Sequence, residues 1–170
     1  MLFAVELARL LVFAAPKLDE GCAGAEKKLM YNYDEALNDC FAIRVSPCDV
    51  AAQKQLFNTA QCFYTMRANK KCSGGSKPVP RKDGSIQCDA NSAKSKQCAK
   101  GSVCTGKVCC DAEIESEHLM EKYVTSCGRG IKAIRADGQI LYSKSCSVDF
   151  CPHGSTCTMG RNYAFCCPPY

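Results

Sequence analysis

Cysteine is the most prominent chemically reactive residue type in this chain. Sixteen of its 170 residues are cysteine, and they fall into three separated groups. The groups hold four cysteines (Cys22, Cys40, Cys48 and Cys62), six between residues 72 and 110, and six between residues 127 and 167. Each group is even, so each can pair its own thiols. Because disulfides persist in oxidising compartments, the pattern predicts a secreted, extracellular chain of three disulfide-bonded modules.

Zinc binding and cysteine catalysis are the other chemistries that so many thiols suggest. A structural zinc site commonly uses paired Cys-x-x-Cys or closely spaced His ligands, whereas this chain has two histidines, His118 and His153, and no such cysteine pair. A Cys/His nucleophile could involve His153, but an oxidising space leaves no obviously free thiol. No Ser/His/Asp arrangement or phosphate-binding loop stands out. We therefore expect a non-enzymatic protein with no metal and no cofactor.

The charge and composition of the chain limit the classes of partner that it is expected to bind. Trp is absent, aromatic residues make up 8% of the chain, and the net charge is +5. Segments with so little apolar surface need covalent cross-links to stay folded. The basic residues are scattered, which favours a solvated basic face over a site for an acidic polymer. No aromatic residues interleave with them, so nucleic acid is not an expected partner.

The amino terminus, residues 1–15, is a poor candidate for a signal segment. It is apolar overall and ends in small residues before Pro16, but Glu6 and Arg9 interrupt the apolar run. The clean stretch from Leu10 to Ala15 is too short to span a membrane. A truncated start is the alternative interpretation, and the prediction of secretion depends on the cysteines.

The elements that would position the first cysteine group form a small α+β unit over residues 18–66. Residues 29–33 favour a strand that ends at Asp34, and residues 41–45 would return as its partner. A short helix is expected from Asn58 or Thr59, with Cys62, Phe63 and Met66 on one face.

These residues resemble a Kunitz (BPTI-type) protease-inhibitor domain. The resemblance covers about 45 residues and includes an eight-residue separation between the second and third cysteines. The residues that carry it are Gly21, Cys22, Tyr31, Tyr33, Asp34, Cys40, Cys48, Phe57 and Cys62. It implies the bridges Cys22–Cys48 and Cys40–Cys62, one of the three pairings open to four cysteines. It also implies a small core of Tyr31, Tyr33 and Phe57.

The resemblance implies inhibition of a serine protease by an exposed loop that mimics a substrate. The expected contact loop comprises Cys22, Ala23, Gly24 and Ala25, with Cys48 beside it. Ala23 would enter the specificity pocket of the enzyme. A methyl group is too short to reach the acidic floor of a trypsin-like pocket, so the expected partner is an elastase-like or other small-pocket serine protease.

Departures from the family pattern favour a second interpretation. The positions of the outermost Kunitz bridge hold Phe13 and Met66, Ser46-Pro47 replaces two glycines, and Gln55 stands where asparagine is expected. In this alternative the chain is a non-inhibitory extracellular matrix or interaction protein that binds an extracellular protein partner. A toxin-like channel blocker is a third and weaker possibility.

The second and third cysteine groups, residues 72–110 and 127–167, form an internal repeat. Cys98–Thr105 aligns with Cys151–Thr158, and Arg81–Gly84 aligns with Arg135–Gly138. The pattern resembles the lustrin-type cysteine-rich repeat of secreted worm proteins, which often accompanies Kunitz domains. The expected fold class is thus a small disulfide-rich, multi-module protein, in which an α+β Kunitz-like domain precedes two short β-hairpin modules.

Asp-Gly pairs predict the positions of the hairpin turns in the two repeats. Asp83-Gly84 and Asp137-Gly138 are typical of tight hairpin turns, because both central residues need a positive φ. Residues 85–87 and 139–142 would then form the returning strands. The adjacent cysteines that end each repeat are expected to bond different partners, and fifteen pairings are open within each repeat. Between the repeats, residues 111–126 are acidic and helix-favouring, which predicts a solvated linker.

Overall fold

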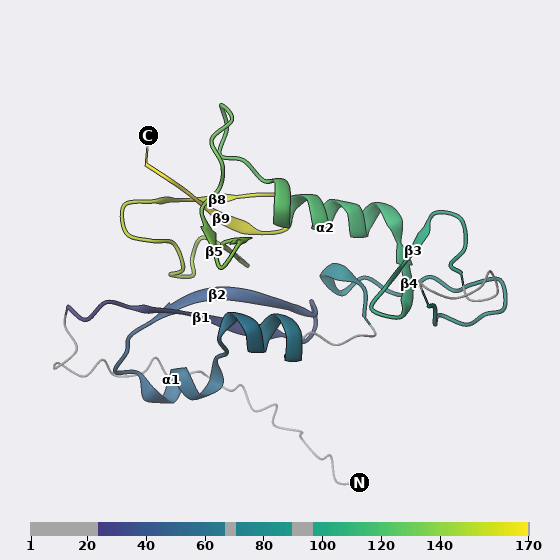
Figure 1. Cartoon of the computed structure of the whole chain (residues 1–170), viewed down its shortest axis with the longest axis horizontal. Coiled ribbons are helices and arrows are strands. Elements are labelled where there is room, and N and C mark those ends of the chain that lie inside the picture. The colour runs from purple at the N-terminus through teal and green to yellow at the C-terminus, as the bar shows by residue number, and fades with distance from the viewer. Residues whose placement is uncertain (1–23, 67–70, 90–96, 170) are drawn as a thin grey trace, which may run out of the picture.

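The computed structural model describes residues 24–66, 71–89 and 97–169 (Figure 1). The described chain is a small disulfide-rich protein with few helices and short antiparallel sheets. Its strands are β1 (Lys28–Asp34), β2 (Asp39–Val45), β3 (Ser102–Thr105), β4 (Val108–Asp111), β5 (Arg135–Ala136), β6 (Gln139–Ile140), β7 (Tyr142–Ser143), β8 (Thr156–Met159) and β9 (Ala164–Cys167). Its helical elements are α1 (Val50–Gln55), the π-helical turn η2 (Gln61–Met66), the 3-10 turn η3 (Ser73–Gly75) and α2 (Ala112–Val124). The candidate signal segment, residues 1–15, lies outside the described residues.

The longest sheet is the β1-β2 hairpin. Its antiparallel register runs from Lys28 opposite Val45 to Asp34 opposite Asp39. At the turn, Asp34 Oδ1 accepts a hydrogen bond from the backbone of Leu37 at 2.9 Å, which closes a local side-chain turn. The strand–turn–strand expected from the sequence is therefore present.

The helix expected from Asn58 is also present. Asn58 Oδ1 accepts a hydrogen bond from the backbone of Gln61 at 2.8 Å, as an N-cap residue does. The following turn, η2, contains Cys62, which is bonded to Cys40 of β2. Helix α1 was not expected from the sequence; Asp49 caps it by accepting from the backbone of Ala52 at 2.8 Å.

The two six-cysteine groups have the same disulfide connectivity. In each group the first cysteine bonds the sixth, the second bonds the fourth, and the third bonds the fifth. The bridges are Cys72–Cys110, Cys88–Cys104 and Cys98–Cys109 in one group, and Cys127–Cys167, Cys146–Cys157 and Cys151–Cys166 in the other. The adjacent cysteines thus bond different partners, and the shared choice among fifteen pairings supports the internal repeat.

The first repeat does not form its hairpin where the sequence suggested. Residues 81–85 do make a turn, with the Arg81 backbone N–H donating to Ser85 O at 2.8 Å, but Gln87 then makes only a single bridge to Val108. The hairpin is instead β3-β4, and its turn is Gly106-Lys107, with φ of 54° and 71°. Two consecutive residues of positive φ match the right-handed twist of paired strands. By the repeat alignment this hairpin corresponds to β8-β9 of the second repeat, whereas in the Asp83-Gly84 turn only Gly84 has a positive φ, of 79°.

The second repeat keeps the predicted turn and divides the predicted strand. Asp137 and Gly138 have φ of 51° and 80°, and they connect β5 to β6. The expected returning strand, residues 139–142, is not continuous, because β6 pairs with β5 whereas β7 pairs with β9. Strands β7, β9 and β8 make the one three-stranded sheet among the described residues.

The first module and the second repeat share one hydrophobic core. Its buried members come from the hairpin and η2 (Tyr31, Cys40, Ala42, Cys62) and from the C-terminal part of the chain (Leu141, Phe150, Ala164, Cys166). The backbone of Arg44 also donates to Asp149 O at 2.6 Å. Figure 1 shows the β1-β2 hairpin beneath the β8-β9 sheet. These modules are therefore packed against each other.

Residues 111–126, the segment expected to be a linker, contain a helix that packs against both repeats through its polar side chains. Residues 112–124 form α2, which Asp111 caps by accepting from the backbones of Glu113 and Ile114. Lys122 of this helix is only 6% exposed. The helix-favouring composition of this segment thus corresponds to a real helix, whose polar side chains also find partners in the neighbouring modules.

Candidate functional site

The described residues of the predicted contact loop, Gly24, Ala25 and Cys48, lie beyond the open end of the β1-β2 hairpin. The pairing of Lys28 with Val45 brings the segment before β1 and the segment after β2 to the same end. The first contains Gly24 and Ala25, which are exposed, and the second contains Cys48. Gly24 has a φ of 99° and open space around its Cα. Cys22 and Ala23 lie outside the described residues.

The segment after β2 is held by a set of short-range hydrogen bonds. The backbone of Asp49 donates to Ser46 O at 3.0 Å, and the Gln53 side chain donates to Ser46 O at 3.0 Å and to Pro47 O at 2.7 Å. Cys48 is disulfide-bonded, and its expected partner Cys22 lies outside the described residues. Gln53 was not singled out from the sequence; its position one helical turn after Asp49, the N-cap of α1, was the available signal. These bonds hold the Ser46–Asp49 segment against the start of α1.

The base of the hairpin is a small aromatic core. Tyr31 is buried, and its backbone exchanges two 2.9 Å hydrogen bonds with Phe57. Its ring meets Phe63 edge-on at 5.4 Å, and burial raises the pKa of its hydroxyl. Tyr33 packs at the edge and donates to Asn38 Oδ1 at 2.9 Å. Tyr31, Tyr33 and Phe57 thus lie together under the hairpin.

A buried polar cluster that the sequence did not predict joins three parts of the chain. The carboxylate of Asp39, at the start of β2, is 1% exposed and forms an ion pair with Lys122 of α2. It also accepts hydrogen bonds from the hydroxyls of Tyr142 at 3.1 Å and Tyr163 at 3.2 Å. The Lys122 ammonium lies over both rings, 5.7 and 5.4 Å from their centroids. A buried charge is stable only with such complete pairing.

His118 extends this cluster toward the first repeat. Its Nδ1 is hydrogen-bonded to the Tyr163 hydroxyl at 2.7 Å. Burial lowers the pKa of the His118 imidazole, and the nearby Lys122 charge lowers it further. Gly74 of η3 packs under the ring, where a Cβ would lie 2.3 Å from His118 Nε2. The imidazole therefore occupies space that a larger residue at position 74 would fill.

Two glutamates of α2 bind the repeats on either side of it. Glu115 accepts from the backbone and hydroxyl of Ser73 at 2.7 and 2.9 Å. Glu121 accepts from the backbones of Asn162 at 2.9 Å and Tyr163 at 3.1 Å. These two acidic residues thus hold α2 between the repeats.

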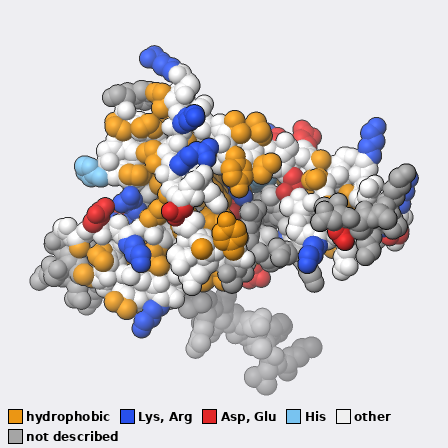
Figure 2. Space-filling view, in the orientation of Figure 1, with side chains coloured by type: hydrophobic (Ala, Val, Ile, Leu, Met, Phe, Trp, Pro, Cys, Tyr) orange, Lys and Arg blue, Asp and Glu red, His pale blue; other side chains and the backbone are white. Residues whose placement is uncertain are grey.

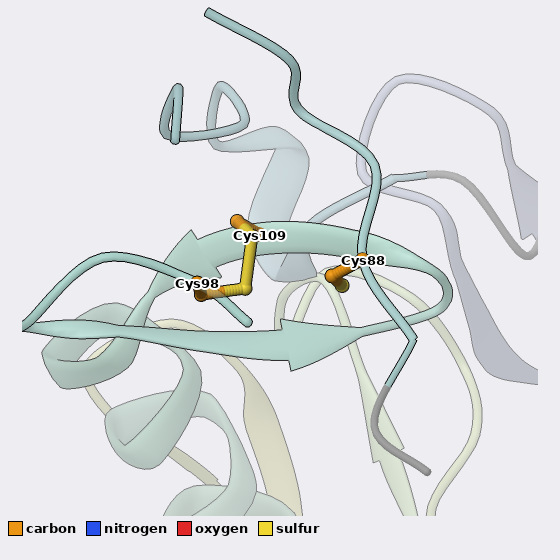
Figure 3. A group of neighbouring side chains, drawn as sticks. All are labelled: Cys88, Cys98 and Cys109. Atoms are coloured by element: carbon orange, nitrogen blue, oxygen red, sulfur yellow. A yellow bond between two sulfur atoms is a disulfide. The ribbon is translucent and has the colours of Figure 1, made fainter. Parts of the chain in front are cut away.

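Among the described residues, one group of potential metal ligands consists of Cys88, Cys98 and Cys109, whose sulfur atoms lie within 4.8 Å of one another. Figure 3 shows the Cys98–Cys109 disulfide with the Cys88 side chain beside it. Cys88 is itself bonded to Cys104. Metal binding by cysteine requires thiolates, so in this oxidised state the group stabilises the first repeat.

Comparison with known proteins gives two distant relatives. A BPTI/Kunitz inhibitor domain-containing protein of Caenorhabditis elegans is 26% identical over 166 residues, covering 89% of this chain and 85% of its own. The major allergen Ani s 1 of Anisakis simplex is 25% identical over 161 residues, covering 89% and 81%. No family model and no solved structure matches the chain. The domain named in the first relative agrees with the Kunitz resemblance of residues 18–66.

Within the described ranges, neither helix combines the length and hydropathy that a membrane span requires. The described disulfides fit an extracellular protein, as does the likeness to a Kunitz-domain protein.

Proposed function

We propose that this chain is a secreted serine-protease inhibitor-like protein that acts through a substrate-mimicking loop around Cys22-Ala23-Gly24. The observation that carries the proposal is the open end of the β1-β2 hairpin. There the pairing of Lys28 with Val45 places the segment with the exposed Gly24 and Ala25 at the same end as the hydrogen-bonded segment Ser46–Asp49. A loop held by a rigid neighbour loses little entropy on binding, so it can bind an enzyme tightly.

The proposal includes a division of the chain into modules. Residues 18–66 would be the Kunitz-like domain, supported by the hairpin, the Cys40–Cys62 bridge and the named domain of one relative. Residues 72–110 and 127–167 would be lustrin-type repeats, supported by their common disulfide connectivity. Secretion is supported by the number of disulfides.

Substitution of Ala23 tests the proposed loop directly. We expect the wild-type chain to inhibit an elastase-like protease, and we expect Ala23→Arg to bind trypsin roughly a hundredfold more tightly than the wild type. The reason is that a guanidinium paired with the acidic floor of the trypsin pocket contributes about 3 kcal/mol. Titration of each recombinant protein against elastase-, chymotrypsin- and trypsin-like enzymes measures both effects.

The matched control is Ala25→Arg, which adds the same charge two residues away and should leave trypsin binding nearly unchanged. Correct folding would be established by non-reducing peptide mapping of the Cys40–Cys62 bridge. A correctly folded wild type that inhibits none of the three enzymes would overturn the proposal.

The second candidate function is that of a non-inhibitory extracellular interaction protein. It is favoured by the shared core, which buries Tyr31 and Ala42 of the hairpin against Leu141 and Phe150 of the second repeat. In that case the Kunitz-like fold is one part of a larger scaffold. Ala23→Arg would then gain no trypsin binding, so the same titration separates the two functions.

A further inference from the structure

Helix α2 has its polar and apolar sides reversed. Its polar residues Glu115, His118, Glu121 and Lys122 face the rest of the protein and make the contacts described above. Its large apolar residues face outward: Leu119, Met120, Tyr123 and Val124 are 59, 54, 45 and 60% exposed. A surface helix ordinarily buries the apolar side and exposes the polar one. The reversal leaves an apolar stripe without a partner among the residues that the structure describes.

The neighbouring strand β3 extends this stripe into a surface, which we call the α2 face. Val103 of β3 is 42% exposed. A groove of about 380 Å³ lies between α2 and β3, with Val103, Thr105, Leu119 and Tyr123 in its walls. Figure 2 shows hydrophobic side chains gathered over α2. A contiguous exposed patch of this kind marks an interaction surface.

The size of the α2 face suits a second copy of the chain. Five side chains, each about half exposed and each with roughly 200 Å² of surface, present on the order of 500 Å². Two such faces in contact would bury on the order of 1,000 Å², which is near the lower limit for a specific interface. The side chains along the helix could enter the groove of the other copy.

Charge at the two ends of α2 favours an antiparallel pairing. Glu113 is exposed at the N-terminal end. At the C-terminal end, the exposed Arg135 donates to the carbonyl of Tyr123 at 2.8 Å, and the exposed Lys132 pairs with Ser126. A two-fold axis across α2 would place the acidic end of one copy beside the basic end of the other and would oppose the helix dipoles.

We propose that two copies of this chain associate through the α2 face, with their α2 helices antiparallel across a two-fold axis. Leu119 and Tyr123 of each copy contact the groove of the other, and Glu113 approaches the basic end of the partner helix. The association depends only on the α2 face, so it stands whether or not the Cys22-Ala23-Gly24 loop inhibits a protease.

Sedimentation velocity of the full chain over a concentration series tests the dimer. We expect wild type to shift from 18.5 kDa to twice that mass as concentration rises. Leu119→Lys and Val124→Lys should each raise the dimer dissociation constant at least about tenfold, because the interface would desolvate an unpaired ammonium. The matched control is Val50→Lys on α1, where Val50 is 58% exposed and lies outside the α2 face.

A photoreactive phenylalanine in place of Met120 gives an independent readout of the same contact. Cross-links to residues 112–124 of a second copy would support the proposal. A wild type that stays monomeric at every concentration would overturn the proposal. Binding of that monomer to neutral phosphatidylcholine vesicles would show that the α2 face contacts lipid and would overturn it as well. A dimer that survives both lysine variants, with cross-links elsewhere, would place the interface on another face and would equally overturn it.

Discussion

At the scale of single residues, the buried pair of Asp39 and Lys122 is the most consequential contact in the chain. Both side chains are almost fully buried, and the carboxylate also has two tyrosine hydroxyls as hydrogen-bond donors. Removing a charge from water costs several kcal/mol, and only a complete set of partners offsets this cost. The pair therefore depends on Tyr142 and Tyr163 as well as on its own attraction.

Lys122→Ala should lower the free energy of unfolding by about 3–5 kcal/mol, because it leaves the Asp39 carboxylate buried without its cation. Urea denaturation monitored by circular dichroism measures the change. The control is Lys27→Ala, since the Lys27–Asp149 pair has about half of each side chain exposed. That variant should lose less than about 1 kcal/mol. Equal losses in the two variants would contradict a special role for Asp39.

At the scale of elements, α2 carries a pH-sensitive contact. The pKa of His118 is lowered by burial and by the Lys122 charge, with Asp39, Glu115 and Glu121 acting in the opposite direction. Because the pKa of His118 is lower in the folded chain than its ordinary value of 6.5, the unfolded chain binds a proton at His118 at a higher pH than the folded chain does. Because the unfolded state then binds more protons than the folded state, the free energy of unfolding decreases as the pH falls.

We expect the wild type to lose more stability than His118→Gln when the pH is lowered from about 7.5 to about 5. The difference between the two proteins isolates His118 from the carboxylates that titrate in both. Urea unfolding at each pH provides the measurement, and His153→Gln, at an exposed histidine, serves as the control. Parallel pH profiles for wild type and His118→Gln would contradict the expectation.

Some of the secondary-structure elements could be predicted from the sequence and others could not. The β1-β2 hairpin, the helix from Asn58 and the Asp137-Gly138 turn were predicted because neighbouring residues determine each of them. The returning strand expected after Asp83-Gly84 is absent from the described residues, because Gln87 makes a single bridge to Val108 of β4 and no ladder back to the residues before the turn.

The buried cluster was not accessible in the same way. Asp39 and Lys122 come into contact only when the first module, α2 and the second repeat pack together. The residues next to each of them in the sequence give no signal of that contact. The pattern of α2 was a partial signal, since Leu119, Met120, Tyr123 and Val124 are unusual in a segment expected to be solvated. Of the predicted contact loop, only Gly24, Ala25 and Cys48 lie within the described residues.

At the scale of the whole molecule, the shared core couples the first module to the second repeat. Phe150 is 1% exposed and lies in the same cluster as Tyr31 and Cys40. Thr59 of the first module also donates to Asp137 of the second repeat at 2.5 Å. Since these contacts cross the module boundary, the two parts should unfold in one cooperative transition.

Phe150→Ala should destabilise both parts together, by about 3–5 kcal/mol, because it opens a cavity in their common core. Native-state hydrogen exchange would show faster exchange at the amides of Tyr31 and Ala42 in the variant. Ile86→Ala, at a residue of the first repeat that is 40% exposed, is the control and should change neither the stability nor these amides appreciably. Unchanged exchange at Tyr31 in Phe150→Ala would show that the modules unfold independently.

The disulfides hold the chain together within each cysteine group, whereas non-covalent contacts hold it together across α2. Each bridge between described cysteines closes a loop inside one cysteine group, and none of them spans residues 112–124. A backbone cut between Cys98 and Cys109 would leave its two ends tethered by sulfur. A cut within α2 would leave them joined only by hydrogen bonds, ion pairs and packing, so α2 is the place where one broken peptide bond could become two separate molecules.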